Sequence, residues 1–266
     1  MEKLYIIKIG GNVVDDESAL AQFLHNFASI QANKILVHGG GKLATRIAEA
    51  MGIQQQLVEG RRITDAETLK IVTMVYAGYI NKNIVAQLQQ HQCNAIGLSG
   101  ADGNAIIAHK RNKTDALGKA VDFGFVGDVD AVNANFIHQL IAQGNTPVMA
   151  PITHNGAGQL LNTNADTIAQ ETAVAMAKLY ETVLIYSFEK SGVLLDTNEE
   201  DSVIKALTPA YYATLKEQEV IYAGMIPKLD NAFAAINKGV SKVIIGKAAQ
   251  LNLLIQQQSG TTISNG

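Results

Sequence analysis

Hydrophobic residues along this chain fall into short runs that alternate with stretches of helical spacing. Apolar runs rich in β-branched residues occupy 4–9 and 35–37, and each ends in a glycine turn, Gly10-Gly11 or Gly39-Gly40-Gly41. Between the runs, large apolar residues recur at spacings of three and four over 20–30, which predicts an amphipathic helix. A strand, a helix and a second strand in this order predict parallel pairing through a crossover helix.

The same alternation continues toward the end of the chain. Further strands are predicted over 95–98, 147–150, 182–187 and 242–245, and further helices over 135–143, 166–179 and 229–236. The stretch 104–130 differs, because alternation and scattered glycines replace helical spacing, and it predicts antiparallel hairpins beside the main sheet. The pattern therefore indicates an α/β protein; if it has two lobes, they join near 179–181 and share one sheet.

Composition narrows the class of protein. With 266 residues, 47% of them hydrophobic and 17% charged, the chain can bury a full core, and disorder is not expected. The net charge of -3, without a basic stripe, argues against a nucleic-acid partner. Cys93 is the single cysteine, and no apolar run approaches the ~20 residues of a membrane span. We expect a cytoplasmic protein without a membrane partner.

Glycine turns after parallel strands are the strongest chemical signal. Gly10-Gly11 and Gly39-Gly40-Gly41 fall where strand carboxyl ends should meet helix amino ends. Glycine lets backbone N–H groups approach an anion closely, and the helix end adds partial positive charge. A tight turn without a ligand explains one such turn equally well, but two of the same kind favour phosphate binding. Neither turn matches the P-loop or the dinucleotide-binding fingerprint.

Two lysines lie close to such turns in the sequence. Lys8 is inside an apolar strand, where a buried ammonium is costly unless it meets an anion, so we favour a phosphate contact over a lysine that reaches solvent. Lys228 follows Pro227 at a predicted helix start, where a positive charge opposes the helix dipole unless a phosphate is bound. Taken alone, Lys228 is better explained as an exposed lysine.

Two polar segments are candidates for holding a substrate. Residues 162–166, Asn-Thr-Asn-Ala-Asp, can cap the following helix. A helix cap is a sufficient explanation for one of these polar side chains, but it explains three of them less well. Arg61-Arg62 could hold a carboxylate through paired hydrogen bonds, or could be a solvated basic pair on a hairpin. Neither segment decides the function by itself.

Together these residues resemble the amino-acid kinase family, most closely its branch that acts on N-acetylglutamate. The matching segments, in order, are Ile7–Gly11, Val37–Gly41, Arg62–Thr64, Gly97–Gly100, Val121–Val129, Leu161–Asp166 and Gly224–Lys228. The resemblance implies an open αβα sandwich with a mainly parallel central sheet and antiparallel hairpins in its N-terminal lobe. Residues 1–179 would form the amino-acid-binding lobe and residues 180–266 the nucleotide-binding lobe.

The resemblance also implies roles for individual residues. Lys8 and Lys228 would stabilise the charge on the transferred phosphoryl group, and Asp166 would hold both lysines in place. The residues that would bind the amino-acid substrate are Gly40, Gly41, Arg62 and Asn162. Those that would bind phosphates and nucleotide are Gly10, Gly11, Glu189, Lys190, Ser191, Gly192, Gly224 and Met225.

The implied reaction is the ATP-dependent phosphorylation of the γ-carboxylate of N-acetyl-L-glutamate, a step of arginine biosynthesis that yields an acyl phosphate. With an ordinary pKa of ~4.3 this carboxylate is ionised at pH 7, so no general base is required. The obstacle is repulsion between two anions. Lysines, helix amino ends and a Mg²⁺ carried on the ATP phosphates would reduce it, without a metal site in the protein itself.

Departures from the family pattern leave alternatives open. Phe188-Glu189-Lys190 stands where relatives have Thr-Asp or Ser-Asp followed by Val or Ile. This difference is either neutral, because the contact there is made by the backbone, or it changes the preference for nucleotide. Other candidate acceptors are N-succinyl-L-glutamate, aspartate, glutamate, carbamate and UMP. A catalytically weak ligand sensor is the alternative from another class. Because the first strand begins near Met1, we expect a homodimer without arginine feedback.

Overall fold

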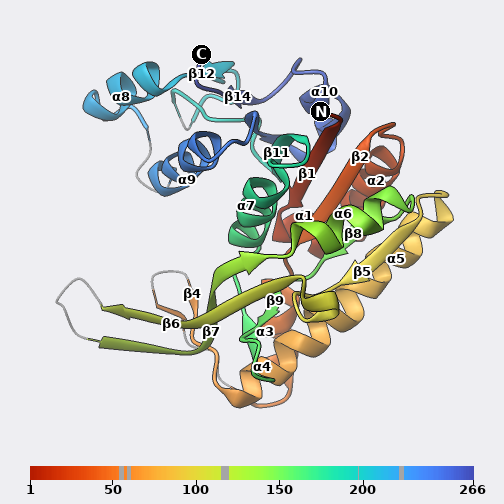
Figure 1. Cartoon of the computed structure of the whole chain (residues 1–266). Helices are drawn as coiled ribbons and strands as arrows, with labels where there is room; N and C mark the ends of the chain where they lie inside the picture. Colours follow the sequence, from red (N-terminus) through yellow and green to blue (C-terminus); the bar gives the residue numbers. More distant parts are fainter. Residues whose placement is uncertain (54–56, 59–60, 115–119, 197, 222–224) are drawn as a thin grey trace.

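The centre of the molecule is one twisted sheet (Figure 1). The computed structural model describes residues 1–53, 57–58, 61–114, 120–196, 198–221 and 225–266. Within these residues the sheet has eight strands in the order β12-β14-β13-β11-β1-β2-β8-β5. Their bounds are β1 (Lys3–Ile9), β2 (Asn33–His38), β5 (Ala95–Leu98), β8 (Thr146–Met149), β11 (Glu181–Phe188), β12 (Ala206–Leu207), β13 (Lys242–Lys247) and β14 (Thr261–Ile263). Neighbours are parallel except β13 and β14, so the predicted mainly parallel sheet is confirmed.

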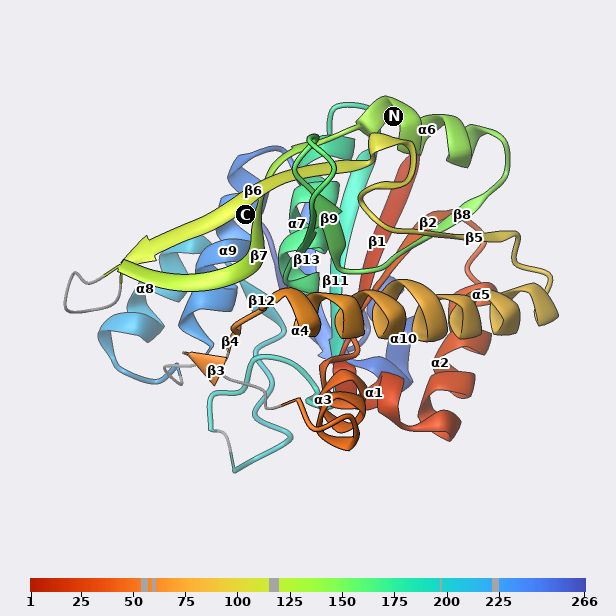
Figure 2. The same cartoon turned by 90° about the horizontal axis from the view of Figure 1, so that it is seen from below.

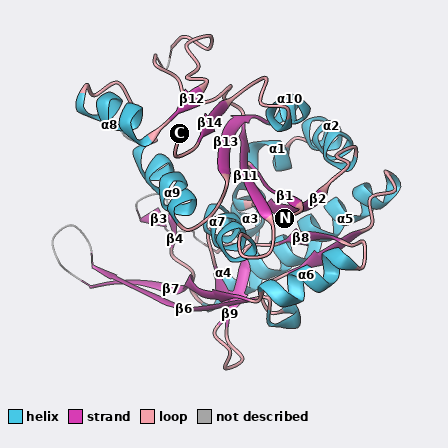
Figure 3. Ribbon diagram, turned by 45° about the horizontal axis from the view of Figure 1, so that its top comes forward, coloured by secondary structure: helices cyan, strands magenta, loops and turns pink. Residues whose placement is uncertain are grey.

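Helices cover both faces of this sheet, which gives three layers (Figure 3). Leu4 and Ile6 of β1 belong to a core that also includes residues of the helices α6 (Ala134–Ala142), α7 (Ala165–Met176), α8 (Pro209–Glu217) and α9 (Ile226–Asn237). Tyr5, Ile7 and Ile9 face the other layer, which includes α1 (Gly11–Asp15), α2 (Glu17–Ala28), α3 (Gly41–Ala50) and α10 (Leu251–Ile255). Successive residues of a strand point to opposite faces, so each central strand serves two cores.

A long helical run crosses the same layer as α2 and α3 (Figure 2). It consists of α4 (Ala66–Val72), the π-helix η1 (Thr73–Ile80) and α5 (Asn81–Gln90). Eight residues of π-helix are unusual, since this form occurs mostly as single turns and often at functional sites. Tyr76 and Ile80 of the π-helix pack against Gly40, where a Cβ would lie only 2.2 Å from Ile80 Cδ1. The glycine turn therefore depends on this run, which the sequence pattern did not predict.

The stretch predicted to form antiparallel hairpins does so. Strands β6 (Ile106–Thr114) and β7 (Ala120–Val132) pair antiparallel and extend away from the body of the molecule (Figure 1). With β9 (Ile152–His154) and β10 (Leu160–Asn162) they close into a small second sheet. The remaining elements are β3 (Leu57–Val58), β4 (Arg61–Arg62) and the 3-10 turns η2 (Asp102–Asn104) and η3 (Ala248–Gln250).

Strands from both proposed lobes belong to the same sheet, because β1 and β11 pair from Lys3–Glu181 to Ile9–Ser187. This confirms the shared sheet, while the division at 179–180 stays a prediction. The helix predicted over 166–179 is shorter, since α7 ends at Met176. The N–H groups of Leu179 and Tyr180 both donate to the carbonyl of Met176, which turns the chain into β11. In the described residues no helix combines the length and apolar character that a membrane span requires.

Candidate functional site

Strand alternation decides where Lys8 points. Lys8 shares its face of β1 with Leu4 and Ile6, the face that α7 covers, and it pairs in register with Tyr186 of β11. Only 9% of Lys8 is exposed, and its Nζ lies 2.8 Å from Oδ1 of Asp166 in the first turn of α7. The ammonium expected to need an anion therefore has one, and the structure brings together two of the three predicted catalytic residues.

The third predicted catalytic residue, Lys228, reaches the same place from α9. Its Nζ lies 4.3 Å from the centre of the Phe188 ring, and Lys8 Nζ lies 5.2 Å from the same centre. The two amines are therefore no farther apart than the sum of these distances. Phe188 follows Tyr186 by two residues and so lies on the same face of β11. Lys228 is exposed, as expected for a lysine in the first turn of a helix.

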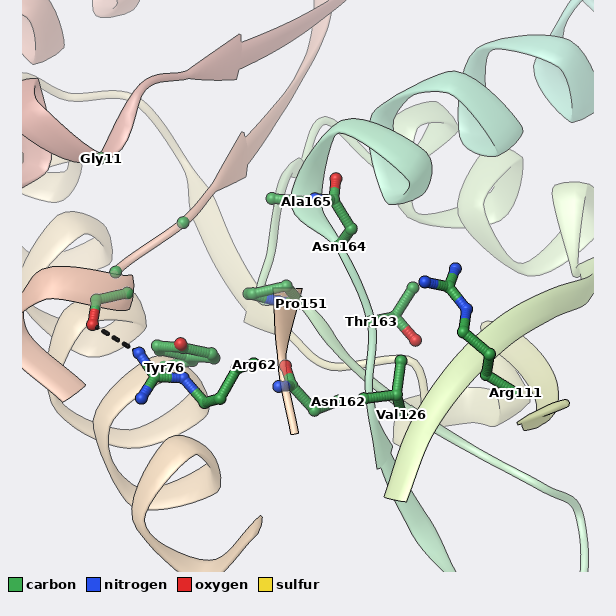
Figure 4. Close-up of a pocket in the computed structure, with 13 residues that line it drawn as sticks. Gly11, Arg62, Tyr76, Arg111, Val126, Pro151, Asn162, Thr163, Asn164 and Ala165 are labelled. Carbon is green, nitrogen blue, oxygen red and sulfur yellow. Dashed lines mark hydrogen bonds between the residues drawn. The ribbon is translucent and has the colours of Figure 1, made fainter. Parts of the chain in front are cut away.

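A cavity of about 290 Å³ opens beside this group at the carboxyl edge of the sheet. Such edges are where open α/β sheets bind ligands, and this volume suits a small molecule. Of the predicted residues, Gly11, Gly40, Gly41, Arg62 and Asn162 line it, together with Gly39, Tyr76, Arg111, Val126, Pro151, Thr163, Asn164 and Ala165. Figure 4 shows Arg62 and Tyr76 on one side of the space and Asn162, Thr163 and Arg111 on the other.

Local contacts fix the two predicted substrate-binding side chains. Nη2 of Arg62 donates to the carbonyl of Gly41 at 3.0 Å and to Oγ1 of Thr45 at 2.7 Å. Nδ2 of Asn162 donates to Oγ1 of Thr64 at 3.0 Å. Arg62 is thereby held against the start of α3, and its charge lies at the wall of the cavity (Figure 4). Arg62 is therefore held by the protein rather than free in solvent, and its role in binding a carboxylate stays a prediction.

Helix amino ends also face the cavity. Gly41 begins α3 and Ala165 begins α7, and both line the space. The N–H of Gly10 is already used, since it donates to the carbonyl of Ser187, whereas Gly11 lines the cavity. The partial positive charge of the helix ends adds to the charge of Arg62, so the cavity suits an anion.

Two polar side chains of the cavity, Arg111 and Tyr76, were not identified from the sequence. Arg111 of β6 is buried and forms a fork of hydrogen bonds to Asp128 of β7, which the pattern of a single hairpin strand does not reveal. Tyr76 belongs to the unexpected π-helix, and burial raises the pKa of its hydroxyl, which stays protonated. Asn164 caps α7 by accepting from the N–H groups of Asp166 and Thr167, and Thr163 bonds to Thr153. Thr163 and Asn164 belong to the segment 162–166, and the number of polar residues in this segment was the sequence signal for a site there.

The predicted nucleotide-binding residues follow β11. Glu189 and Lys190 are exposed just beyond its end, and Ser191 is half-buried. Gly192 is buried, and a Cβ there would lie 2.8 Å from both Thr261 Oγ1 and Val203 Cγ1, so packing alone requires a glycine. Met225 precedes α9, and Gly224 lies outside the described residues. The proposed contacts of these residues with nucleotide stay predictions.

A buried histidine supports the second glycine turn. His38 is completely buried at the end of β2, and its Nδ1 donates to the carbonyl of Gly39 at 2.8 Å. Nδ2 of Asn81, the first residue of α5, donates to the other ring nitrogen at 3.1 Å and to the carbonyl of Val148 at 3.0 Å. The neutral ring thus links the turn to the long helical run.

Acid should therefore destabilise the fold through His38. Burial lowers the pKa of His38 from its ordinary 6.5 to about 4. Because the unfolded chain binds this proton more tightly, the contribution of the neutral ring is complete above pH 6.5 and is lost as the pH falls toward 4. We expect the free energy of unfolding to drop by about 3 kcal/mol between pH 7 and pH 4 from this group, measured by urea titration.

The variant His38→Gln isolates this effect. It should show a pH dependence smaller by about 3 kcal/mol between the same two pH values, whatever its stability at pH 7. Equal pH dependence in wild type and His38→Gln would contradict a neutral buried ring.

Fold and site define an α/β protein that gathers cations and helix amino ends around one cavity at the edge of its sheet. The chain belongs to the amino acid kinase family, whose sequence model matches residues 3–247. It is 57% identical over 257 residues to a protein named acetylglutamate kinase from Cytophaga hutchinsonii, covering 97% of this chain and 96% of that one. A protein of the same name from Phocaeicola vulgatus is 56% identical over 262 residues, covering 98% of each.

A solved structure supports the fold independently. The protein smu.665 from Streptococcus mutans UA159 superposes with a TM-score of 0.77 at 27% identity, over 99% of both chains. The family predicted from the glycine turns, lysines and polar segments, and the α/β fold with a mainly parallel sheet, are thus confirmed.

Proposed function

We propose that this chain is an ATP-dependent kinase that phosphorylates the γ-carboxylate of N-acetyl-L-glutamate in arginine biosynthesis. The observation that carries the proposal is the meeting of Lys8, Asp166 and Lys228 at one edge of the sheet, next to a cavity lined by Arg62. The relatives named acetylglutamate kinase, which match nearly the whole chain, support this choice of acceptor over the other candidate acceptors of the family.

In the proposed reaction an oxygen of the γ-carboxylate attacks the γ-phosphorus of ATP. The new bond is C–O–P, the bond from that phosphorus to the β,γ-bridging oxygen breaks, and ADP leaves with the electron pair. No proton needs to be removed from the acceptor at pH 7. The protein has to hold two anions together and neutralise the charge that spreads over the phosphoryl oxygens. Lys8 and Lys228, which meet at the Phe188 ring, are the cations proposed for this task.

The substrate is proposed to occupy the cavity between Arg62 and Asn162. Arg62 would bind the α-carboxylate, because a guanidinium matches the two oxygens of a carboxylate. Asn162 would bind the acyl-amino end, with its amide as donor and acceptor. The amino ends of α3 and α7 would face the phosphoryl group, since Gly41 and Ala165 line the same space.

ATP is proposed to bind with Mg²⁺ held on its own phosphates. Among the described residues there is no group of three or more side chains suited to hold a metal ion. Mg²⁺ commonly binds through substrate phosphates and water, and it would add positive charge where the triphosphate meets the carboxylate. The nucleotide lobe 180–266, the homodimer and the cytoplasmic location stay predictions of this proposal.

A hydroxamate assay tests the function directly. Purified protein with ATP, Mg²⁺ and hydroxylamine should convert N-acetyl-L-glutamate to a coloured acyl hydroxamate. N-Succinyl-L-glutamate, L-glutamate and L-aspartate run in parallel should react with at least tenfold lower kcat/KM, because Asn162 is proposed to bind the acetylamino end, which these three compounds lack. A preference for N-succinyl-L-glutamate would make that compound the acceptor instead of N-acetyl-L-glutamate. The absence of product with all four compounds would favour a ligand sensor.

A further inference from the structure

One aromatic ring touches both proposed catalytic lysines. Phe188 is the last residue of β11, and its ring centre lies 5.2 Å from Lys8 Nζ and 4.3 Å from Lys228 Nζ. Both distances are within the range of a cation–π interaction.

The two lysines differ in what else holds them. Lys8 is buried and paired with Asp166, whereas Lys228 is exposed and forms no ion pair within the described part of the chain. An exposed lysine has many rotamers, and a second ammonium close by repels it. The negative face of an aromatic ring attracts both cations without binding either through a directional bond. Phe188 thus gives the exposed Lys228 a favourable contact beside Lys8, whose own charge is paired with Asp166.

The ring itself is held in place by its own strand. Tyr186 and Phe188 stack with their ring planes 5° apart and their centres 6.2 Å apart. The hydroxyl of Tyr186 donates to the backbone carbonyl of Asp166 at 3.4 Å, and burial raises the pKa of Tyr186, so the donor stays protonated. Cδ1 of Phe188 also lies only 3.6 Å from where a Cβ of Gly10 would be. The rings therefore connect β11 to the start of α7 and to the first glycine turn.

The space around the ring is too small to be a ligand site. Phe188, Asp166 and Lys228 line a separate cavity of only about 30 Å³, about a tenth of the volume of the substrate cavity. A nucleotide does not fit in this space, and the ring contacts the two lysines while it also packs against the core on this face of the sheet.

We propose that Phe188 is a positioning residue that holds Lys8 and Lys228 together before the triphosphate arrives. This inference rests on the proposed phosphoryl transfer. It predicts that the π-face of residue 188, rather than its volume, supports turnover. Phe188→Leu keeps an apolar side chain and removes the ring, whereas Phe188→Tyr keeps the ring.

We expect Phe188→Leu to lower kcat roughly fivefold to thirtyfold, from the loss of two cation–π contacts of ordinary strength, with KM for the acylglutamate changed less than twofold. Phe188→Tyr should restore kcat to within about threefold of wild type. Phe233→Leu is the matched control. Phe233 of α9 stacks on Tyr212 of α8 with ring centres 5.2 Å apart and belongs to the core against which Phe188 packs. It should lower the melting temperature without a comparable loss of kcat.

A spectroscopic measurement tests the contact without turnover. In protein labelled at lysine Cε, with signals assigned through Lys8→Arg and Lys228→Arg, the Hε signals of both lysines should shift upfield in wild type and Phe188→Tyr, and return in Phe188→Leu. If the wild-type protein shows no turnover, the proposed function is overturned, and the spectrum alone tests whether the ring contacts both lysines. Unshifted signals, or full kcat in Phe188→Leu when wild type is active, would overturn the positioning role.

Discussion

Replacing Lys228 with methionine should lower kcat by about 10²–10³-fold, the usual cost of removing one group that stabilises transition-state charge. The side chain reaches the region between α7, β1 and β11, where its amine lies over the ring next to Lys8. Because this charge acts on the phosphoryl group as it transfers, kcat and kcat/KM should fall by similar factors, while KM for the acylglutamate changes little. Steady-state kinetics in the hydroxamate assay measure all three.

Lys238 provides the matched control for this experiment. It is exposed at the opposite end of α9, so Lys238→Met removes the same charge from the same helix away from the site. That variant should keep kcat within twofold of wild type. Lys8→Met should resemble Lys228→Met, and the double variant should lose less than the product of the single losses, because the two lysines act as a unit. A loss below threefold in Lys228→Met would remove this lysine from the mechanism.

The parts of the fold that rest on local pattern could be predicted from the sequence. The central strands are short apolar runs with distinct ends, so β1, β2, β5, β8, β11 and β13 all appear near their expected positions. The π-helix η1 could not be predicted, since residue spacing does not distinguish its hydrogen-bond shift from that of an α-helix. The two-residue strand β12 pairs with β14, and so short an element leaves no periodicity to detect.

The residues of the site also divide into those that the local sequence identifies and those that it does not. Residues in or next to glycine turns, such as Gly41 and Lys8, could be identified because strand ends of a parallel sheet meet at one edge. Arg111 and Phe188 could not, because their significance depends on partners far away in the sequence. Arg111 needs Asp128 across a hairpin, and Phe188 needs Lys8 and Lys228 from two other elements. Sequence spacing carries no information about such meetings.

Arg62→Gln should raise KM for N-acetyl-L-glutamate by about 10-fold to 100-fold, as expected for loss of charge-assisted hydrogen bonds to a carboxylate. The glutamine keeps a polar end but loses the charge and the planar fork that match two carboxylate oxygens. Since Arg62 also donates to the carbonyl of Gly41, a smaller fall in kcat, below about tenfold, should accompany the change through a shift of the glycine turn. Kinetics with ATP held at saturation separate the two constants.

Arg46→Gln is the control that makes this result specific. Arg46 belongs to α3, which begins at Gly41, but 64% of its side chain is exposed, and it faces Asp15 at 3.8 Å outside the substrate cavity. Its loss should leave KM within twofold of wild type, because Arg46 does not line the substrate cavity. Arg62→Lys should recover only part of the lost affinity, since a point charge lacks the fork. An unchanged KM in Arg62→Gln would mean that the carboxylate is held elsewhere, and Arg111, across the same cavity, would become the candidate.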